Sequence, residues 1–230
     1  MIPKVIHYCW FGGNKKSSII KKCIKSWREK LPDYELKEWN EKNFDININS
    51  FVKNAYHNKK WAFVSDYCRL WVLYNYGGIY LDTDMEVLKS INIFLDNDSF
   101  SGTEDGEHIS FGIWGCKAED QFIKEILDYY DNLNFNDYRE DLFKLAIPIV
   151  ITEIANKKGF IKTINHSTYF GENIKVYPKD VFYPKKHSWE EPIITERTYT
   201  IHHYEGSWRS KKQIIKSKIK KIVMQLKNGR

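Results

Sequence analysis

Two aspartates spaced two residues apart, Asp82 and Asp84, are the residues of this chain best suited to hold a divalent cation. They follow residues 79–81 (Ile-Tyr-Leu), which have the apolar and aromatic content of a buried strand. Side chains alternate along a strand, so the two carboxylates would share a face while Thr83 points the other way. Two like charges at the end of an apolar strand repel each other and resist burial. A bound cation relieves that repulsion, and oxygen ligands suit Mg²⁺ or Mn²⁺.

The surroundings of the two aspartates decide between a metal site and an ordinary turn. A bare Asp-x-Asp is common by chance, and a solvated strand end is then the better interpretation. Here a long aromatic helix over residues 59–76 comes first, and Gly77-Gly78 ends it with residues that permit positive φ. A helix, a glycine pair, an apolar strand and then two aspartates form a far more specific pattern, which favours the metal site.

The same helix carries polar residues on an apolar background. Asp66 and Arg69 are three apart and can touch on one face, with Ser65 beside them. From the residues alone, the favoured interpretation is a surface ion pair of little energetic weight.

The opening of the chain predicts an α/β sheet. Residues 4–11 have the content of a strand, Ser17-Ser18 can cap a helix that runs to Leu31, and residues 34–39 alternate like a second strand. Sheets of this kind bind nucleotides at the carboxyl ends of their strands, where Trp10 falls. Trp10 could stack on a nucleobase, but the residues alone favour a core tryptophan.

The later segments predict further helices and strands. Helices are expected at 50–57, 119–133 and 139–157, the last kinked or broken by Pro148, and strands at 99–104, 109–116, 174–177, 181–183 and 199–204. The acidic loop 104–108 fits a solvated connection better than an acceptor contact. His202 and His203 point to opposite faces of the last strand, so at most one joins a given site. Unaided, a hydrogen-bonded surface histidine is the favoured interpretation.

Composition indicates a folded domain with a basic tail. The chain has 230 residues, 42% of them hydrophobic and 16% aromatic, which is enough for one core. Residues 209–230 hold nine Lys or Arg and no acid, although the net charge of the whole chain is only +6. The basic character is therefore confined to the tail and does not indicate a nucleic-acid groove. The tail predicts a basic amphipathic helix that either docks on an anionic membrane or packs on the domain.

Four cysteines at positions 9, 23, 68 and 116 lack paired metal spacing and fit reduced, buried thiols. The chain begins at once with a core-like strand, which leaves no room for a signal peptide. No apolar run approaches the roughly 20 residues of a membrane span. These features predict a cytoplasmic protein that can lie peripherally on the inner face of the cell membrane through residues 209–230.

Two of the segments described above resemble glycosyltransferases with a DXD motif. They are residues 61–69 (Trp-Ala-Phe-Val-Ser-Asp-Tyr-Cys-Arg) and 77–84 (Gly-Gly-Ile-Tyr-Leu-Asp-Thr-Asp). The closest resemblance is to glycosyltransferase family 32, which includes yeast sugar transferases and bacterial capsular polysaccharide enzymes, and a more distant one is to the clostridial glucosylating toxins. Residues 2–12 and 202–208 resemble the same group's first strand and C-terminal motif. The resemblance implies a single α/β domain of the GT-A type over residues 1–208, with a mixed central sheet flanked by helices, followed by the basic helix 209–230.

The resemblance also implies roles for individual residues. Asp66 would accept sugar hydroxyls, Arg69 would lie near sugar and phosphate, and Asp84 would complete the catalytic set. The metal ligands would be Asp82, Asp84 and His203, with His202 as the second choice of histidine. Donor and cofactor contacts would come from Trp10, Ser65, Tyr80, Asp82, Ser207 and Trp208.

The implied reaction is sugar transfer from a nucleotide donor with Mn²⁺ or Mg²⁺. A UDP-sugar is the expected donor and GDP-mannose the alternative, with a saccharide or lipid-linked saccharide as acceptor. The resemblance further implies retention at the anomeric carbon and a place in surface polysaccharide synthesis.

Two other functions fit parts of the pattern. A phosphohydrolase of the haloacid dehalogenase type also ends a strand in Asp-x-Asp, but Met85-Glu86 stands where that group usually has Thr or Val. A non-catalytic carbohydrate-binding module fits the aromatic content. The complete set of acids, Arg69 and Trp208 argues against it.

Overall fold

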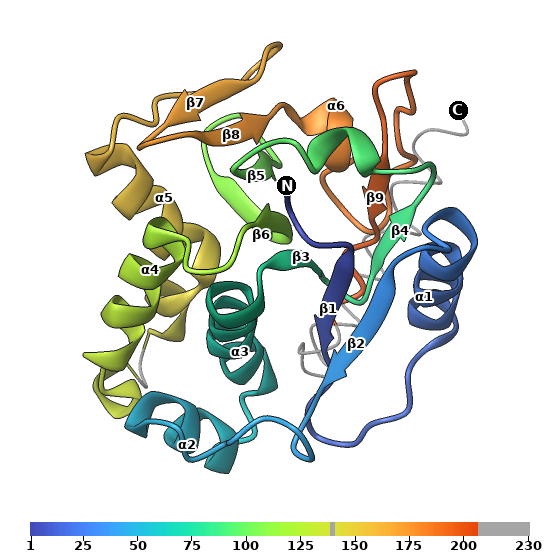
Figure 1. Cartoon of the computed structure of the whole chain (residues 1–230). Helices are drawn as coiled ribbons and strands as arrows, with labels where there is room; N and C mark the ends of the chain where they lie inside the picture. The colour runs from blue at the N-terminus through green and yellow to red at the C-terminus, as the bar shows by residue number, and fades with distance from the viewer. Residues whose placement is uncertain (139–140, 207–230) are drawn as a thin grey trace, which may run out of the picture.

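The computed structural model describes residues 1–138 and 141–206, which form a mixed sheet covered by helices on both faces (Figure 1). Strands β1 (Val5–Cys9), β2 (Glu35–Trp39) and β3 (Gly78–Leu81) are parallel neighbours. β6 (Ile109–Cys116) runs antiparallel to both β3 and β5 (Ser99–Thr103). β8 (Ile174–Tyr177) lies parallel to β5, and β7 (Thr168–Phe170) closes the edge. The sheet order is therefore β2-β1-β3-β6-β5-β8-β7, and the predicted α/β class with a mixed sheet is confirmed.

A second, two-stranded sheet crosses behind the end of β3. It pairs β4 (Met85–Val87) with β9 (Thr200–His202) in antiparallel register, with Met85 opposite His202. Helix α1 (Ser18–Lys30) packs on this pair, and its Trp27 donates a hydrogen bond from Nε1 to the Met85 carbonyl at 2.6 Å. The pairing brings the last described strand of the chain next to the two aspartates.

The hydrophobic core has two layers, one on each face of the sheet. One layer gathers α2 (Ser50–His57), α3 (Trp61–Tyr76), α4 (Gln121–Asp131) and α5 (Ile147–Lys157). The other contains α1, the β4–β9 pair and the short helix α6 (Lys179–Phe182). Short 3₁₀ turns occupy Asn92–Phe94, Phe135–Tyr138 and Leu142–Leu145. Because α3 lies against β1 and β3, its inner face meets the carboxyl ends of these strands.

Local sequence explains most element boundaries. The Ser17 side chain accepts a hydrogen bond from the Ile20 N–H and begins α1, and Gly77, at φ 61°, ends α3. Pro148 stands in the first turn of α5, so the predicted helix 139–157 is broken rather than kinked. The predicted strand at 181–183 is wrong: Pro178 caps the short helix α6 there.

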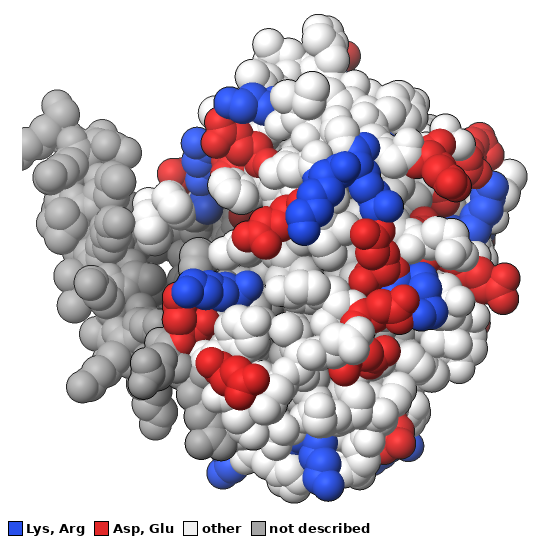
Figure 2. All heavy atoms as spheres, turned by 90° about the vertical axis from the view of Figure 1, so that its left-hand side faces the viewer, with Lys and Arg blue, Asp and Glu red and all other residues white. Residues whose placement is uncertain are grey.

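On the face seen in Figure 2, acidic and basic side chains are interspersed. Among the described helices, none combines the length and hydropathy needed to cross a bilayer. The predicted basic helix 209–230 lies outside the described residues.

Candidate metal and donor site

Asp82 and Asp84 lie in a tight turn between β3 and β4, and not on a strand. The turn is closed by the Met85 N–H, which donates to the Asp82 carbonyl at 2.9 Å, while the Asp82 N–H donates to Gly112 on β6. Strand alternation is therefore the wrong reason for their proximity, because β3 ends at Leu81. The turn brings the two carboxylates together instead, and the buried strand before it fixes where the turn begins.

His202 joins the two aspartates because β9 pairs with β4. Its Nε2 lies 3.2 Å from Asp84 Oδ1, and one ligand atom each of Asp82, Asp84 and His202 lies within 4.8 Å of the other two. The N–H of Glu205 also donates to Asp84 Oδ2 at 2.8 Å. The end of β9 thus holds Asp84 from two sides.

His203 faces away from this cluster. Its Nε2 lies 2.8 Å from Glu86 Oε2, and the same Glu86 oxygen pairs with Lys22 of α1 at 2.8 Å. The preference for His203 over His202 as the metal ligand is therefore not supported by the geometry. Adjacent strand residues do point to opposite faces, and the register of β4 with β9 turns His202 inward.

Arg69 connects the helix to the turn. Its guanidinium lies 3.1 Å from Asp66 Oδ1 and 3.2 Å from Asp82 Oδ1, and it donates to the Phe111 carbonyl at 3.3 Å. The guanidinium also lies 4.5 Å from the centre of the Tyr80 ring, whose hydroxyl donates to Asp82 at 3.0 Å. Asp66 and Arg69 are both buried, so the sequence-based interpretation as a surface ion pair is wrong.

The acids around Arg69 are hard to ionise together. Burial raises the pKa of Asp66 to about 7, although Arg69 opposes the rise, and Asp82 adds to it. Burial also raises the pKa of Asp82, with Asp84 adding and Arg69 opposing. One arginine between the buried Asp66 and the half-buried Asp82 leaves negative charge that a further cation would stabilise.

Asp84 and His202 shift each other in opposite directions. Burial favours the neutral form of both, but His202 outweighs it and lowers the pKa of Asp84 to about 2. Burial likewise lowers the pKa of His202, yet Asp84 and Glu104 raise it to about 10. Without a cation, the histidine proton therefore supplies the positive charge next to Asp84.

The residues present fit a hard divalent cation. Two carboxylates and one imidazole nitrogen converge on one point, and such a set suits Mn²⁺ or Mg²⁺. A cation at this point would replace the proton on His202 Nε2. The cation would then supply the positive charge that the proton provides next to Asp84.

The other predicted donor contacts are placed as follows. Trp10 is half-buried at the end of β1, with its Nε1 donating to the Asn14 carbonyl at 2.7 Å and Lys16 above its ring. Ser65 is half-buried on α3, and its carbonyl accepts from Arg69 Nε at 3.3 Å. These contacts neither support nor exclude a donor role for Trp10 or Ser65, so their roles stay predictions. Ser207 and Trp208 lie outside the described residues.

Glu104 is a site residue that the sequence did not reveal. It follows β5 and its Oε1 lies 3.6 Å from His202 Nδ1, whereas loop 104–108 was expected to be solvated. The remainder of that loop is exposed at Asp105, Glu107 and His108. The available signal was its position as the last residue of the predicted strand 99–104, at the carboxyl end of that strand.

Comparison with known proteins agrees with this geometry. Residues 17–101 match the family described as "Glycosyltransferase sugar-binding region containing DXD motif". Inositol phosphoceramide mannosyltransferase 3 of Schizosaccharomyces pombe is 26% identical over 149 residues, 59% of this chain and 39% of that protein. An uncharacterized protein of Arabidopsis thaliana is 27% identical over 120 residues, 52% of this chain and 18% of that protein. This chain therefore matches less than half the length of either relative.

A solved structure shares the fold. The PaToxG glycosyltransferase superposes with a TM-score of 0.56 at 20% sequence identity, covering 69% of this chain and 70% of that one. The likeness supports the predicted GT-A-like arrangement of sheet and helices.

Proposed function

Because its residues 17–101 match the model of the DXD glycosyltransferase family, we propose that this chain is a metal-dependent glycosyltransferase acting on a nucleotide-diphosphate sugar. The observation that carries the proposal is the convergence of Asp82, Asp84 and His202 beside the buried Asp66–Arg69 pair. A binding module has no need to keep so many ionisable groups in a buried cluster.

The chemistry follows from where charge develops. Transfer breaks the bond from the anomeric carbon to a phosphate oxygen and forms a bond from that carbon to an acceptor oxygen, while the acceptor hydroxyl gives up its proton. Negative charge grows on the departing diphosphate, and a divalent cation supplies a Lewis acid that stabilises it. Asp82, Asp84 and His202 would hold that cation at the end of β3.

Asp66 and Arg69 have complementary tasks in this proposal. Arg69 contributes a fixed positive charge close to Asp82, where the diphosphate would bind, and its contacts with Tyr80 and Phe111 keep it from moving. Asp66 is buried and positioned by Arg69, so it would orient the sugar by accepting hydrogen bonds from its hydroxyls.

Two donor classes are supported by different observations. The resemblance of the opening strand, with Trp10 at its end, favours a UDP-sugar. The name of the fission yeast relative, a mannosyltransferase, favours GDP-mannose. We propose UDP-sugar as the first donor to test and GDP-mannose as the second.

The remaining parts of the proposal rest on the family resemblance. The acceptor is a saccharide, free or lipid-linked, the anomeric configuration is retained, and the product enters surface polysaccharide. The four buried free cysteines fit the proposed cytoplasmic location, because that compartment keeps thiols reduced. Contact with the inner face of the membrane would come through residues 209–230. Loss of binding to anionic vesicles on truncation after Trp208 is the expected result, and unchanged binding would remove that part.

Turnover tests the proposal directly. The purified chain is incubated with Mn²⁺, one nucleotide sugar at a time and a pool of saccharide acceptors, and free nucleotide and the anomeric form of the product are measured. We expect release of one nucleotide from one donor class, dependent on the metal and on Asp84. Sugar-nucleotide turnover that is absent with every donor and metal would favour the binding module.

A further inference from the structure

The carboxylate of Glu104 lies on the far side of His202 from the proposed metal site. Its Oε1 accepts a hydrogen bond from the Ser110 hydroxyl at 2.8 Å and lies 3.6 Å from His202 Nδ1. Glu104 and Ser110 stand on the two arms of the β5–β6 hairpin, so the carboxylate is anchored to the main sheet. Its side chain is 34% exposed, whereas that of His202 is 13% exposed.

The imidazole of His202 is held between aromatic rings. The Tyr204 ring centre lies 4.1 Å away and the Tyr183 ring meets the imidazole nearly edge-on at 5.9 Å. Within the described residues, His202 Nδ1 is buried and has no hydrogen-bond partner at normal distance. The Glu104 carboxylate faces this nitrogen at 3.6 Å, slightly beyond hydrogen-bond length.

A histidine that binds a metal through Nε2 must carry its proton on Nδ1. Metal-bound histidines commonly donate that second N–H to a carboxylate, which fixes the tautomer and the ring orientation. In this chain Nε2 faces Asp84 at 3.2 Å and Nδ1 faces Glu104, which is the arrangement such a pair requires.

We propose that Glu104 is a positioning residue that holds the Nδ1–H of His202 and so presents its Nε2 lone pair to the divalent cation. The inference rests on the proposed function, because it takes the cation at Asp82, Asp84 and His202 as given. Glu104 does not touch the cation. It acts through the histidine.

Three substitutions separate this role from a general effect on folding. Glu104→Met keeps the length of the side chain and removes the acceptor, whereas Glu104→Gln keeps a carbonyl oxygen that can accept from Nδ1. Glu107→Gln is the matched control, because Glu107 stands in the same hairpin connection but pairs with Lys162 at 2.6 Å. Melting temperatures confirm that all three proteins are folded.

Binding of Mn²⁺ alone is measured by electron paramagnetic resonance on the full chain. Loss of such a partner typically weakens metal binding by about 10- to 100-fold. We expect Glu104→Met to raise the dissociation constant about 10-fold or more, Glu104→Gln to raise it about 3-fold or less, and Glu107→Gln to leave it unchanged.

The outcomes distinguish this inference from the proposed function. If Asp84→Asn abolishes Mn²⁺ binding but Glu104→Met binds Mn²⁺ like wild type, the role of Glu104 is refuted and the metal site stands. If wild type binds no Mn²⁺, both the metal site and the role of Glu104 are refuted.

Discussion

Two histidines, the buried His7 on β1 and the half-buried His202 on β9, mark two polar clusters of opposite character. His7 accepts a hydrogen bond at Nδ1 from Trp39 Nε1 at 3.0 Å, which leaves Nε2–H to donate to the Gly77 carbonyl at 2.9 Å. Burial lowers its pKa to about 4, so it is neutral near pH 7. His202 lies between Asp84 and Glu104, which raise its pKa to about 10 against the effect of burial.

The difference separates a cluster that serves the fold from one that is proposed to serve a ligand. Each ring nitrogen of His7 already has a hydrogen-bond partner, so the imidazole requires no further contact. Around His202, the ion pairs found among the described residues set four carboxylates, those of Asp66, Asp82, Asp84 and Glu104, against Arg69 and the imidazole. A site that is electrostatically incomplete without a cation costs stability, and such costs are typical of functional sites.

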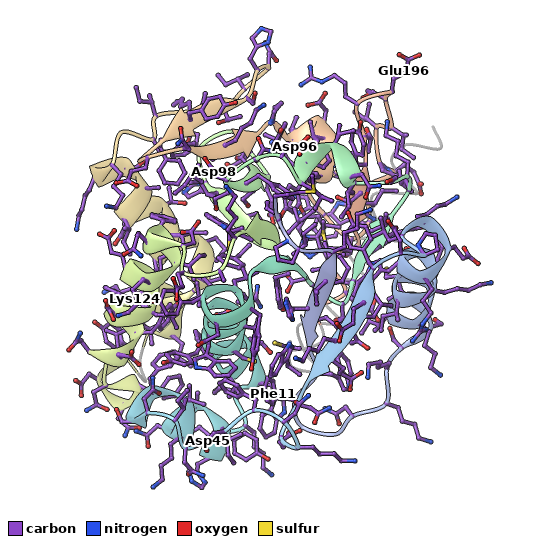
Figure 3. The ribbon with its side chains drawn as sticks, viewed as in Figure 1. Phe11, Asp45, Asp96, Asp98, Lys124 and Glu196 are labelled. Atoms are coloured by element: carbon purple, nitrogen blue, oxygen red, sulfur yellow. The ribbon has the colours of Figure 1, made fainter. Side chains whose placement is uncertain are left out.

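The largest effect is expected from a substitution that disrupts the His202 cluster and leaves the fold intact. Asp84→Asn keeps the shape but removes the charge that faces the cation, so kcat/KM should fall about 10³-fold, equivalent to about 4 kcal/mol. Steady-state turnover measures it. The control Asp96→Asn changes an exposed aspartate (Figure 3) and should have wild-type activity. Wild-type activity in Asp84→Asn would contradict the site.

The reverse experiment removes the hydrogen bonds around His7. His7→Leu leaves the Trp39 N–H and the Gly77 carbonyl unpaired in the core, which should cost about 3 kcal/mol of unfolding free energy. Urea denaturation measures this, with His166→Leu at an exposed histidine as the control. Activity per folded molecule should be unchanged. A stability equal to wild type would show that the two hydrogen bonds contribute little.

A pH series sharpens the comparison. The pKa of His7 is about 4 in the folded state and about 6.5 when unfolded, so the unfolded chain binds more protons below pH 6.5. Its contribution to stability is complete above pH 6.5 and is lost as the pH falls toward 4, by about 3 kcal/mol in all. His7→Gln, which keeps a donor and an acceptor, should remove this part of the slope. Parallel curves for wild type and variant between pH 7 and 4 would exclude a neutral, buried His7.

Ligand addition gives the smallest effect and should act on one cluster only. Mn²⁺ with UDP at about 100 times the dissociation constant adds about 2.7 kcal/mol, a rise in melting temperature of about 5–10 °C. The shift should persist in His7→Gln and vanish in Asp84→Asn. GDP in place of UDP tests the second donor class. If neither nucleotide shifts wild type in the presence of Mn²⁺, the donor proposal fails.

The sequence predicted the parts of the fold that depend on local patterns. Residue type and spacing predicted the strand before Asp82, the helix that carries Asp66 and Arg69, and the capping by Ser17. The segment 181–183 was assigned to a strand because its alternation does not distinguish a strand from one helical turn after Pro178.

The parts of the site that depend on long-range strand pairing could not be predicted from the sequence. Which histidine faces the aspartates depends on the register of β4 against β9, and no local pattern encodes that register. Glu104 was missed for the same reason, since only the folded hairpin brings it to His202. The burial of the Asp66–Arg69 pair likewise follows from the packing of α3 on the sheet, although the spacing of the two residues predicted their contact.

The closure of the turn by β9 has a consequence for how the protein is made. The hydrogen bond from Glu205 to Asp84 joins residues 121 positions apart, and His202 comes from the same late segment. When only the first two hundred residues have left the ribosome, the strands of the main sheet and both aspartates are therefore present. The segment with His202 and Glu205, which contacts Asp84, is not. A growing chain cannot form the proposed cation site in the arrangement described above until β9 has emerged and paired with β4, so synthesis would delay the onset of the proposed activity.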